Sequence, residues 1–201
     1  MEYNNPSQIV KDLTFGESAS DKLIAGVAKL STAVGSTLGA SGRCVIYEDA
    51  LGKPIITKDG VTVAESIVLE DPVENIGATL IKEAAKKTVQ EAGDGTTTAT
   101  VLASELLHQM HNAITLENAN IRDLKAGIES GKQKVLDYLN KSKIDVSDEM
   151  LGQVATISTN NDAALGTIIA DAYKAVGKDG VVLMEESDDE STYYETVDGI
   201  Q

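Results

Sequence analysis

Apolar residues recur every three or four positions along most of this chain, a spacing that predicts helices. Over residues 18–38, one apolar face is formed by Leu23, Val27, Leu30, Val34 and Leu38. The glycine-containing stretch 39–42 follows the last of these positions, and a glycine there is the usual end of a helix. We therefore expect a long first helix that ends near residue 38.

Residues 43–57 are expected to form a β-hairpin. Two short β-prone runs, Cys44–Tyr47 and Ile55–Thr57, flank Leu51-Gly52-Lys53-Pro54, which has the composition of a turn. A short amphipathic stretch follows at residues 61–67. Because Cys44 lies in an apolar run, we expect a buried, inert thiol. With one cysteine the chain forms no internal disulfide, which is compatible with a reducing compartment.

The clearest helix start on the chain is at Asp71. Asp71 is a suitable N-cap, Pro72 suits the first helical position, and Glu74 is placed to complete a capping box. The helix is expected to continue to about Val89. One face of it is predicted to contain Val73, Ile76, Leu80, Ala84 and Thr88.

Two more helices are predicted over residues 97–114 and after Asn120. Helical spacing relates Val101, Leu102, Leu106, Met110 and Ile114 in the first of them. In the second, the residues expected to face inward are Ile121, Leu124, Ile128, Val135 and Leu139.

The character of the sequence changes near residue 140, where we place a domain boundary. A short helix capped by Ser147 is expected next, followed by a helix over Ala163–Val176 that ends at Gly177. Strand-like runs at Val181–Met184 and Tyr193–Val197 flank an acidic segment.

Composition narrows the class of protein. Hydrophobic residues make up 42% of the 201 residues but aromatic residues only 3%, so the core is expected to be aliphatic and the helices closely packed. The net charge of −15 argues against binding to nucleic acid or to an anionic membrane, since both need basic patches. No apolar stretch approaches the length of a membrane span, and Met1–Pro6 resembles neither a signal nor a transit peptide. A cytoplasmic protein is therefore expected.

Two other groups of polar residues are interpreted as surface features. The acidic run Glu185–Glu190 is expected to be an exposed turn rather than a metal site. His108 and His111 lie three residues apart on a predicted helix, with no cysteine nearby. Such a pair is more typical of a helix surface than of a metal site.

The most specific chemical signal is the run Ala92–Val101. It places the carboxylate of Asp94 between two glycines and just before three threonines, Thr96–Thr98, at the predicted start of a helix. A helix N-terminus favours phosphate, and a carboxylate favours a hard cation such as Mg²⁺. The run therefore predicts a site for a metal-bound nucleotide, although an Asp-Gly turn with hydroxyl caps has the same spacing.

Two further segments are candidates for the same site. The loop Gly39–Gly42 permits close approach of a ligand to the backbone, but such loops are more often plain helix ends. Thr57–Gly60 places Lys58, which suits phosphate, beside Asp59, which suits a metal or a water; alone it is more often a surface turn. The chain contains neither a Walker A loop nor the kinase motifs.

Together these segments resemble the group I chaperonins of the GroEL type. The motifs that match include Thr37-Leu38-Gly39, Ile56–Ala64, Leu69–Asp71, Glu74–Ala78, Ala92–Leu102, Asp123–Ile128, Thr156–Asn160 and Val176–Val181. The resemblance extends from about residue 13 to the last residue, and in combination its motifs are highly specific.

The resemblance implies a mainly α fold. Residues 1–140 would be the N-terminal part of an equatorial, ATP-binding domain, a helical bundle with a small β-hairpin. Residues 141–197 would begin an α+β intermediate domain, and residues 198–201 would be the start of an apical domain.

The resemblance also implies roles for individual residues. ATP would be lined by Thr37, Leu38, Gly39 and Ala40, with Lys58 at the phosphate and K⁺ end, and its phosphates would be held by Gly95, Thr96, Thr97 and Thr98. Asp94 would bind Mg²⁺, and Asp59 would assist catalysis by positioning water or the metal shell. The family usually has Pro-Lys where this chain has Ala40-Ser41, a difference that predicts weaker nucleotide affinity.

The resemblance implies that the family's main catalytic aspartate, the binding surface of its apical domain and the rest of its equatorial domain correspond to no residue of this sequence. The resemblance implies that clients and a co-chaperonin bind through that apical domain and that subunits form rings. We therefore expect an ATP-driven protein-folding chaperonin, with the 201 residues alone binding ATP poorly and hardly hydrolysing it. The alternatives are a non-catalytic module that joins or modulates chaperonin rings, and an ATP-binding fragment with no chaperone role.

Overall fold

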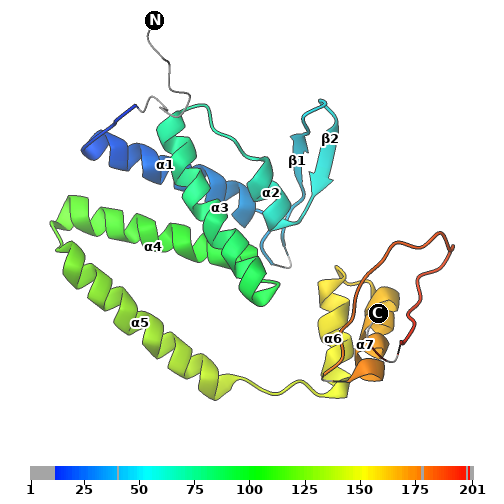
Figure 1. Cartoon of the computed structure of the whole chain (residues 1–201). Helices are drawn as coiled ribbons and strands as arrows, with labels where there is room; N and C mark the ends of the chain where they lie inside the picture. The colour runs from blue at the N-terminus through cyan, green and yellow to red at the C-terminus, as the bar shows by residue number, and fades with distance from the viewer. Residues whose placement is uncertain (1–11, 40, 178, 198, 200–201) are drawn as a thin grey trace, which may run out of the picture. The chain divides into compact units, whose positions relative to one another are not determined.

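A computed structural model describes residues 12–39, 41–177, 179–197 and 199 of the chain (Figure 1). The chain divides into two compact units, Met1–Ser130 and Gly131–Gln201, and helix α5 (Ile121–Ser142) crosses the division. The fold is mainly helical with one small antiparallel hairpin, as the sequence predicts. Residues 198, 200 and 201, most of the predicted start of an apical domain, lie outside the described residues.

Three long helices, α1 (Glu17–Gly35), α3 (Pro72–Ala92) and α4 (Thr96–Glu117), build the first unit together with the short α2 (Gly60–Ser66) (Figure 1). The bounds of α1, α3 and α4 confirm the three predicted helices to within a few residues, and α2 occupies the stretch that the sequence marks only as amphipathic. The core they enclose is aliphatic, as composition predicts, and contains Val27, Leu30, Val34, Val63, Ala64, Ala78 and Ile81.

Helices α1 and α3 cross at two glycines. A Cβ on Gly26 would lie 1.8 Å from the carbonyl oxygen of Glu74, and a Cβ on Gly77 would lie 2.1 Å from that of Leu23. Neither position has room for a side chain, so the two backbones approach each other directly. This close crossing decides which face of α3 is buried.

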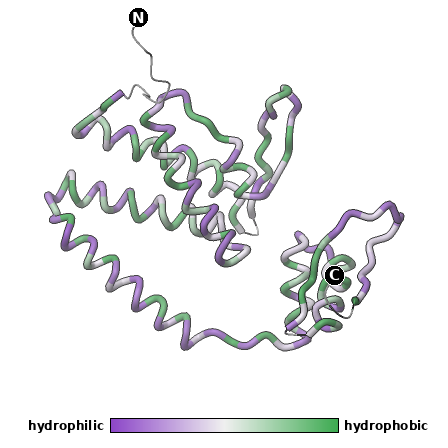
Figure 2. Tube along the Cα trace, viewed as in Figure 1, coloured by the Kyte–Doolittle hydropathy of each residue, from purple (hydrophilic) through white to green (hydrophobic). Residues whose placement is uncertain are grey.

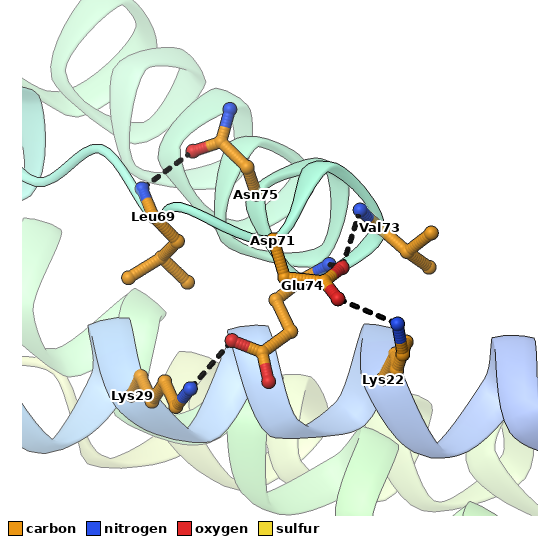
Figure 3. Close-up of polar contacts among 7 residues, drawn as sticks. All are labelled: Lys22, Lys29, Leu69, Asp71, Val73, Glu74 and Asn75. Carbon is orange, nitrogen blue, oxygen red and sulfur yellow. Dashed lines mark hydrogen bonds and ion pairs between the residues drawn. The ribbon is translucent and has the colours of Figure 1, made fainter. Parts of the chain in front are cut away.

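The start of α3 joins this helix to α1 (Figure 3). Asp71 caps α3 by accepting hydrogen bonds from the N–H groups of Val73, at 2.9 Å, and Glu74, at 3.1 Å. The predicted capping box is wrong, because Glu74 Oε2 instead lies 2.5 Å from Lys29 Nζ on α1. Asp71 Oδ2 likewise lies 2.5 Å from Lys22 Nζ. Each carboxylate therefore pairs with a lysine of α1, Asp71 with Lys22 and Glu74 with Lys29, so the start of α3 is tied to α1 by two ion pairs.

The predicted hairpin is confirmed as β1 (Val45–Glu48) and β2 (Pro54–Thr57), paired antiparallel from Val45 opposite Thr57. Its turn is fixed by Asp49 Oδ1, which accepts hydrogen bonds from two backbone N–H groups at 2.8 and 2.9 Å. The predicted burial of Cys44 is wrong, because Cys44 is exposed. Successive strand residues face opposite sides, and Val45 lies on the inner side.

In α3 and α4 the apolar stripes found in the sequence are not the faces that the structure buries. Helix α3 buries Gly77, Ala78, Ile81 and Ala85, whereas Ile76 and Leu80 are 55% and 58% exposed. Helix α4 buries Thr100 and Ser104 rather than Leu102 or Leu106. In both helices the small side chains face the core because they allow the closest approach. Leu38, at the end of the predicted stripe on α1, lies beyond that helix and is exposed.

No described residue of α5 is buried. Apolar and polar residues alternate along it in Figure 2, yet Ile121, Val135 and Leu139 are each more than half exposed. The predicted helix after Asn120 is confirmed. The prediction that Ile121, Val135 and Leu139 face inward is wrong. Leu124 and Ile128 are half-buried, so the described residues cover part of this apolar face and leave Val135 and Leu139 exposed.

The second unit contains the helix pair α6 (Asp148–Ser158) and α7 (Ala163–Val176), both predicted. Ser147 caps α6, and Asp162 caps α7 with two hydrogen bonds of 3.0 Å. The strands expected at residues 181–184 and 193–197 are absent, because neither segment pairs with a second strand in the described part of the chain. The acidic residues 185–190 between them are exposed, as predicted. None of the described helices is long and apolar enough to span a membrane.

Candidate functional site

The ends of three helices meet in the first unit at the segments that carry the sequence signals. Gly60, the first residue of α2, lies so near Thr97 at the start of α4 that a Cβ on Gly60 would be 2.2 Å from Thr97 Oγ1. The same Cβ would be 3.3 Å from Val34 Cγ1, near the end of α1. The fold therefore brings Thr57–Gly60 and Gly93–Thr98 to one place.

The start of α4 is an uncapped helix N-terminus. Gly93 ends α3 with φ +73° and Gly95 precedes α4 with φ +83°, conformations that glycine adopts without strain. Gly95 supplies no side chain to cap the helix, so the N–H groups of Thr96–Thr98 keep the unsatisfied character of a first helical turn. The macrodipole adds positive potential at this end, and together these features suit an anion.

Asp94 lies at the turn between α3 and α4 and is exposed. Its Oδ1 accepts a hydrogen bond of 2.6 Å from the N–H of Gly95, which fixes the carboxylate beside the N-terminus of α4. Lys58, between β2 and α2, is also exposed. Within the described residues neither side chain forms an ion pair.

Asp59 is the N-cap of α2. Its Oδ2 accepts hydrogen bonds from Thr62, at 2.8 Å from the N–H and at 2.5 Å from the hydroxyl. Partial burial alone would raise the pKa of Asp59, but the hydrogen bonds from Thr62 and from the N–H of Val61 outweigh it and lower the pKa below its usual value. The carboxylate is therefore charged at neutral pH, with one oxygen committed to the cap.

The turn after α1 forms the third part of the site. Thr37 is half-buried, and its hydroxyl donates to the carbonyl of Val34 at 2.8 Å. Leu38 and Gly39 are exposed, with Gly39 at φ +74°. The loop closes tightly, since the N–H of Gly42 donates to the carbonyl of Gly39 at 2.9 Å. Ala40, the fourth residue predicted here, lies outside the described residues.

Two contributors to this region were not singled out from the sequence. A Cβ on Gly35 would lie 3.3 Å from Val101 Cγ2, so α1 and α4 pack closely behind the turn. Thr100, one turn into α4, is fully buried, and its hydroxyl has no hydrogen-bond partner in the described structure. The sequence feature that points to Thr100 is its spacing, because Thr97, Thr100 and Ser104 share one face of a helix.

Other candidate ligands lie elsewhere. His111 is half-buried, and its Nε2 lies 3.2 Å from Asp21 Oδ1 on α1, whereas His108 is exposed. Among the residues that the structure describes, no three His, Cys, Asp or Glu side chains gather as a metal site would require.

The family model and the solved structures that this chain matches are all chaperonins. The model of the TCP-1/cpn60 chaperonin family matches residues 30–200. A crystal structure of a group III chaperonin in the open state is 29% identical, with a TM-score of 0.67 over 79% of this chain and 32% of that one. The chaperonin gp146 from the bacteriophage EL 2 (Pseudomonas aeruginosa), crystallised in the presence of ATP-BeFx, is 30% identical. Its TM-score is 0.68, over 80% of this chain and 28% of that one.

This chain thus spans about a third of the length of the solved structures it matches. The matched residues 30–200 include each of the three segments that meet at the candidate site.

Proposed function

Because the chain belongs to the TCP-1/cpn60 chaperonin family, we propose that it forms the N-terminal part of an ATP-dependent chaperonin subunit of the group I type. The observation that carries the nucleotide part of this proposal is the meeting of α1, α2 and α4 at Gly60 and Thr97. The phage chaperonin crystallised with ATP-BeFx supports the choice of nucleotide.

The residues at this meeting point fit Mg-ATP. The N–H groups and hydroxyls of Thr96–Thr98 would hold phosphate oxygens at the uncapped start of α4. Asp94 would bind Mg²⁺ together with those oxygens, since Mg²⁺ is usually held by one or two carboxylates plus phosphate and water. Lys58 would neutralise phosphate charge and lie near a K⁺, while Thr37–Ala40 would line the nucleotide. The metal nucleotide itself supplies the transferable phosphoryl group.

Asp59 is proposed as an assisting residue. Its charged carboxylate accepts hydrogen bonds from Thr62 and from the N–H of Val61, and its remaining lone pairs would orient a water molecule or the hydration shell of the metal. The resemblance to group I chaperonins implies that the family's main catalytic aspartate corresponds to none of the 201 residues. We therefore expect these residues alone to bind ATP weakly and to hydrolyse it very slowly.

In the proposed complete protein, nucleotide turnover would drive the folding of non-native polypeptides inside a ring of identical subunits in the cytoplasm. Clients and a co-chaperonin would bind an apical domain that follows the described residues. The match to solved chaperonins supports self-association and a folding role.

A titration followed by two-dimensional NMR tests the site. Mg-ATP should shift the amide signals of Gly95 and Thr96–Thr98, and Asp94→Ala should weaken the apparent affinity by at least about tenfold, because a charged metal ligand is lost. Asp145→Ala, at an exposed aspartate outside the site, should bind as the unaltered protein does. Shifts that are spread over other helices, or an unchanged affinity for Asp94→Ala, would contradict the assignment.

The exposed apolar face of α5 favours a second candidate function, an interaction module that joins or modulates chaperonin rings. Val135 and Leu139, one turn apart on α5, are 57% and 54% exposed. Native mass spectrometry of the chain mixed with an intact chaperonin would separate the two functions. Incorporation that is independent of ATP, and that Val135→Glu with Leu139→Glu abolishes, would favour the module.

A further inference from the structure

Thr100 is the one described threonine whose hydroxyl is both fully buried and without a hydrogen-bond partner. An unpaired buried hydroxyl destabilises a fold, and valine would have the same shape without that cost. Burial alone therefore does not explain why a hydroxyl stands at this position.

Other helical threonines of this chain use their hydroxyls locally. Six of them donate to the carbonyl four residues earlier at 2.8–2.9 Å: Thr32, Thr79, Thr88, Thr115, Thr156 and Thr167. The equivalent acceptor for Thr100 is the carbonyl of Thr96. A rotation about χ1 brings a helical threonine hydroxyl to this acceptor, since threonine divides between two rotamers in helices.

The carbonyl of Thr96 has a special position. It belongs to the same peptide group as the N–H of Thr97, which lies in the first turn of α4 where Thr97 meets Gly60. A hydrogen bond to a peptide carbonyl polarises the group and strengthens its N–H as a donor. The Thr100 hydroxyl is thus one rotation from strengthening a donor at the proposed phosphate site.

We infer that Thr100 is a positioning residue for phosphate. When a phosphate oxygen accepts from the N–H of Thr97, the hydroxyl of Thr100 rotates and donates to the carbonyl of Thr96. Binding then supplies the hydrogen bond that the buried hydroxyl lacks without ligand, so the two events favour each other. The inference rests on the proposed function, because it requires a phosphate-bearing ligand at the start of α4.

The test compares Thr100→Val and Thr100→Ser with the unaltered protein, using Mg-ATP and adenosine as probes. Without nucleotide, Thr100→Val should raise the melting temperature by about 2–4 °C, because the unpaired hydroxyl is gone. Its affinity for Mg-ATP should nevertheless fall about 3- to 10-fold, the worth of one ordinary hydrogen bond, while binding of adenosine stays the same. The downfield NMR shift of the Thr97 amide proton on binding should also shrink.

Thr100→Ser keeps the hydroxyl and should bind Mg-ATP as the unaltered protein does. Thr79→Val, on the exposed side of α3, is the matched control and should leave the affinity unchanged. If Thr100→Val does not fold, Thr100→Ala provides the second variant without a hydroxyl.

The possible results separate the inference from the proposed function. Unaltered protein that binds no Mg-ATP overturns both. Unaltered protein that binds, with Thr100→Val binding equally well, overturns the inference alone. Equal losses in Thr100→Ser and Thr100→Val also overturn it, because shape rather than the hydroxyl would then matter.

Discussion

The side chain of Thr97 occupies the space that a Cβ on Gly60 would need, with Oγ1 at 2.2 Å from that position. Gly60 begins α2 and Thr97 lies in the first turn of α4, so this contact sets how closely the two helix ends approach. Both residues belong to segments that the sequence marks as candidate nucleotide ligands. Their contact therefore limits how the two helices pack and how far apart the two candidate ligand segments lie.

Gly60→Ala should separate the two helix ends. The methyl group forces Thr97 to rotate or α2 to shift, and overpacking of this kind costs about 1–3 kcal/mol. Urea unfolding followed by circular dichroism measures the loss. We also expect the amide signals of Thr96–Thr98 to move in the absence of ligand.

Gly127→Ala is the matched control for this substitution. Nothing lies within 4 Å of a Cβ on Gly127, which is within α5. Alanine is the better helix former, so the control should gain up to about 1 kcal/mol. Equal stabilities for Gly60→Ala and the unaltered protein would show that the contact with Thr97 is looser than the structure has it.

The elements that were predicted correctly depend on local chemistry. Asp71 followed by Pro72 starts α3, Ser147 starts α6, and Asp162 starts α7, each through a side chain that accepts hydrogen bonds from the next turn. Such signals lie within four residues of one another, and the sequence alone contains them.

The errors concern contacts between distant residues. Glu74 was expected to complete a local capping box, but it pairs with Lys29, 45 positions earlier. Periodicity places Ile76 and Leu80 on the apolar face of α3, whereas the approach of Gly77 to α1 turns a different face inward. Periodicity predicts that a helix has an apolar face, but the partner decides which face is buried.

The candidate site likewise has features that depend on adjacent residues and features that depend on contacts between distant residues. The chemistry of Asp94 and the three threonines was predicted from the sequence, because it depends on adjacent residues. The sequence also offers Thr57–Gly60 as a candidate for the same site through Lys58 and Asp59, although alone this segment is more typical of a surface turn. The contact of Gly60 with Thr97 supports its place beside the start of α4. The unpaired hydroxyl of Thr100 was not predictable, since it results from packing of α4 against its neighbours.

Stability should fall in acid as two helix caps are protonated. The hydrogen bond from Lys22, with those of the backbone, lowers the pKa of Asp71, and the bonds from Thr62 lower that of Asp59 against the effect of burial. A lowered folded-state pKa gives stability that is present above the unfolded value of about 3.9 and is lost as pH falls through the folded value. Melting temperatures measured from pH 7 down to pH 2 should therefore decrease below about pH 4.

Asp71→Asn isolates one of these caps. Asparagine caps a helix about as well as aspartate but does not titrate, so the variant should lose less stability between pH 6 and pH 3 than the unaltered protein. Asp145→Asn, outside any cap of the described helices, should follow the unaltered curve. Identical acid profiles for all three proteins would argue against a role for Asp71.

At alkaline pH the contact between Asp71 and Lys22 should be lost because the lysine is deprotonated. The hydrogen bond and charge of Asp71 raise the pKa of Lys22. A raised folded-state pKa gives stability that is present below the unfolded value of about 10.4 and is lost as pH rises through the folded value. Lys22→Met should flatten the stability profile above about pH 10, as thermal unfolding in that range would show.

The ion pair between Lys29 and Glu74 should contribute only modestly (Figure 3). Lys29 is 55% exposed and Glu74 is 18% exposed, so solvent screens the pair from one side. A double-mutant cycle with alanine at both positions should give a coupling free energy of about 0.5–1 kcal/mol. The exposed pair Lys87 and Glu91 on α3 is the control and should give about 0.3–0.5 kcal/mol. A coupling near zero between Lys29 and Glu74 would mean that the pair does not hold α3 to α1.

The crossing of α1 and α3 should be the least tolerant position in the first unit. A methyl group at Gly26 would lie 1.8 Å from the carbonyl oxygen of Glu74, which is backbone and cannot rotate away. Gly26→Ala should therefore cost more than Gly60→Ala, about 3 kcal/mol or more, because the two helices must move apart along their contact. Gly77→Ala meets the carbonyl of Leu23 at 2.1 Å and should cost a similar amount.

The two substitutions share one contact, so their effects should not add. Once Gly26→Ala has separated the helices, Gly77→Ala finds part of the space already open, and the double variant should lose less than the sum of the single losses. Unfolding in urea of the four proteins measures this directly. Strict additivity would indicate that α1 and α3 relax independently at the two glycines and would contradict a rigid crossing.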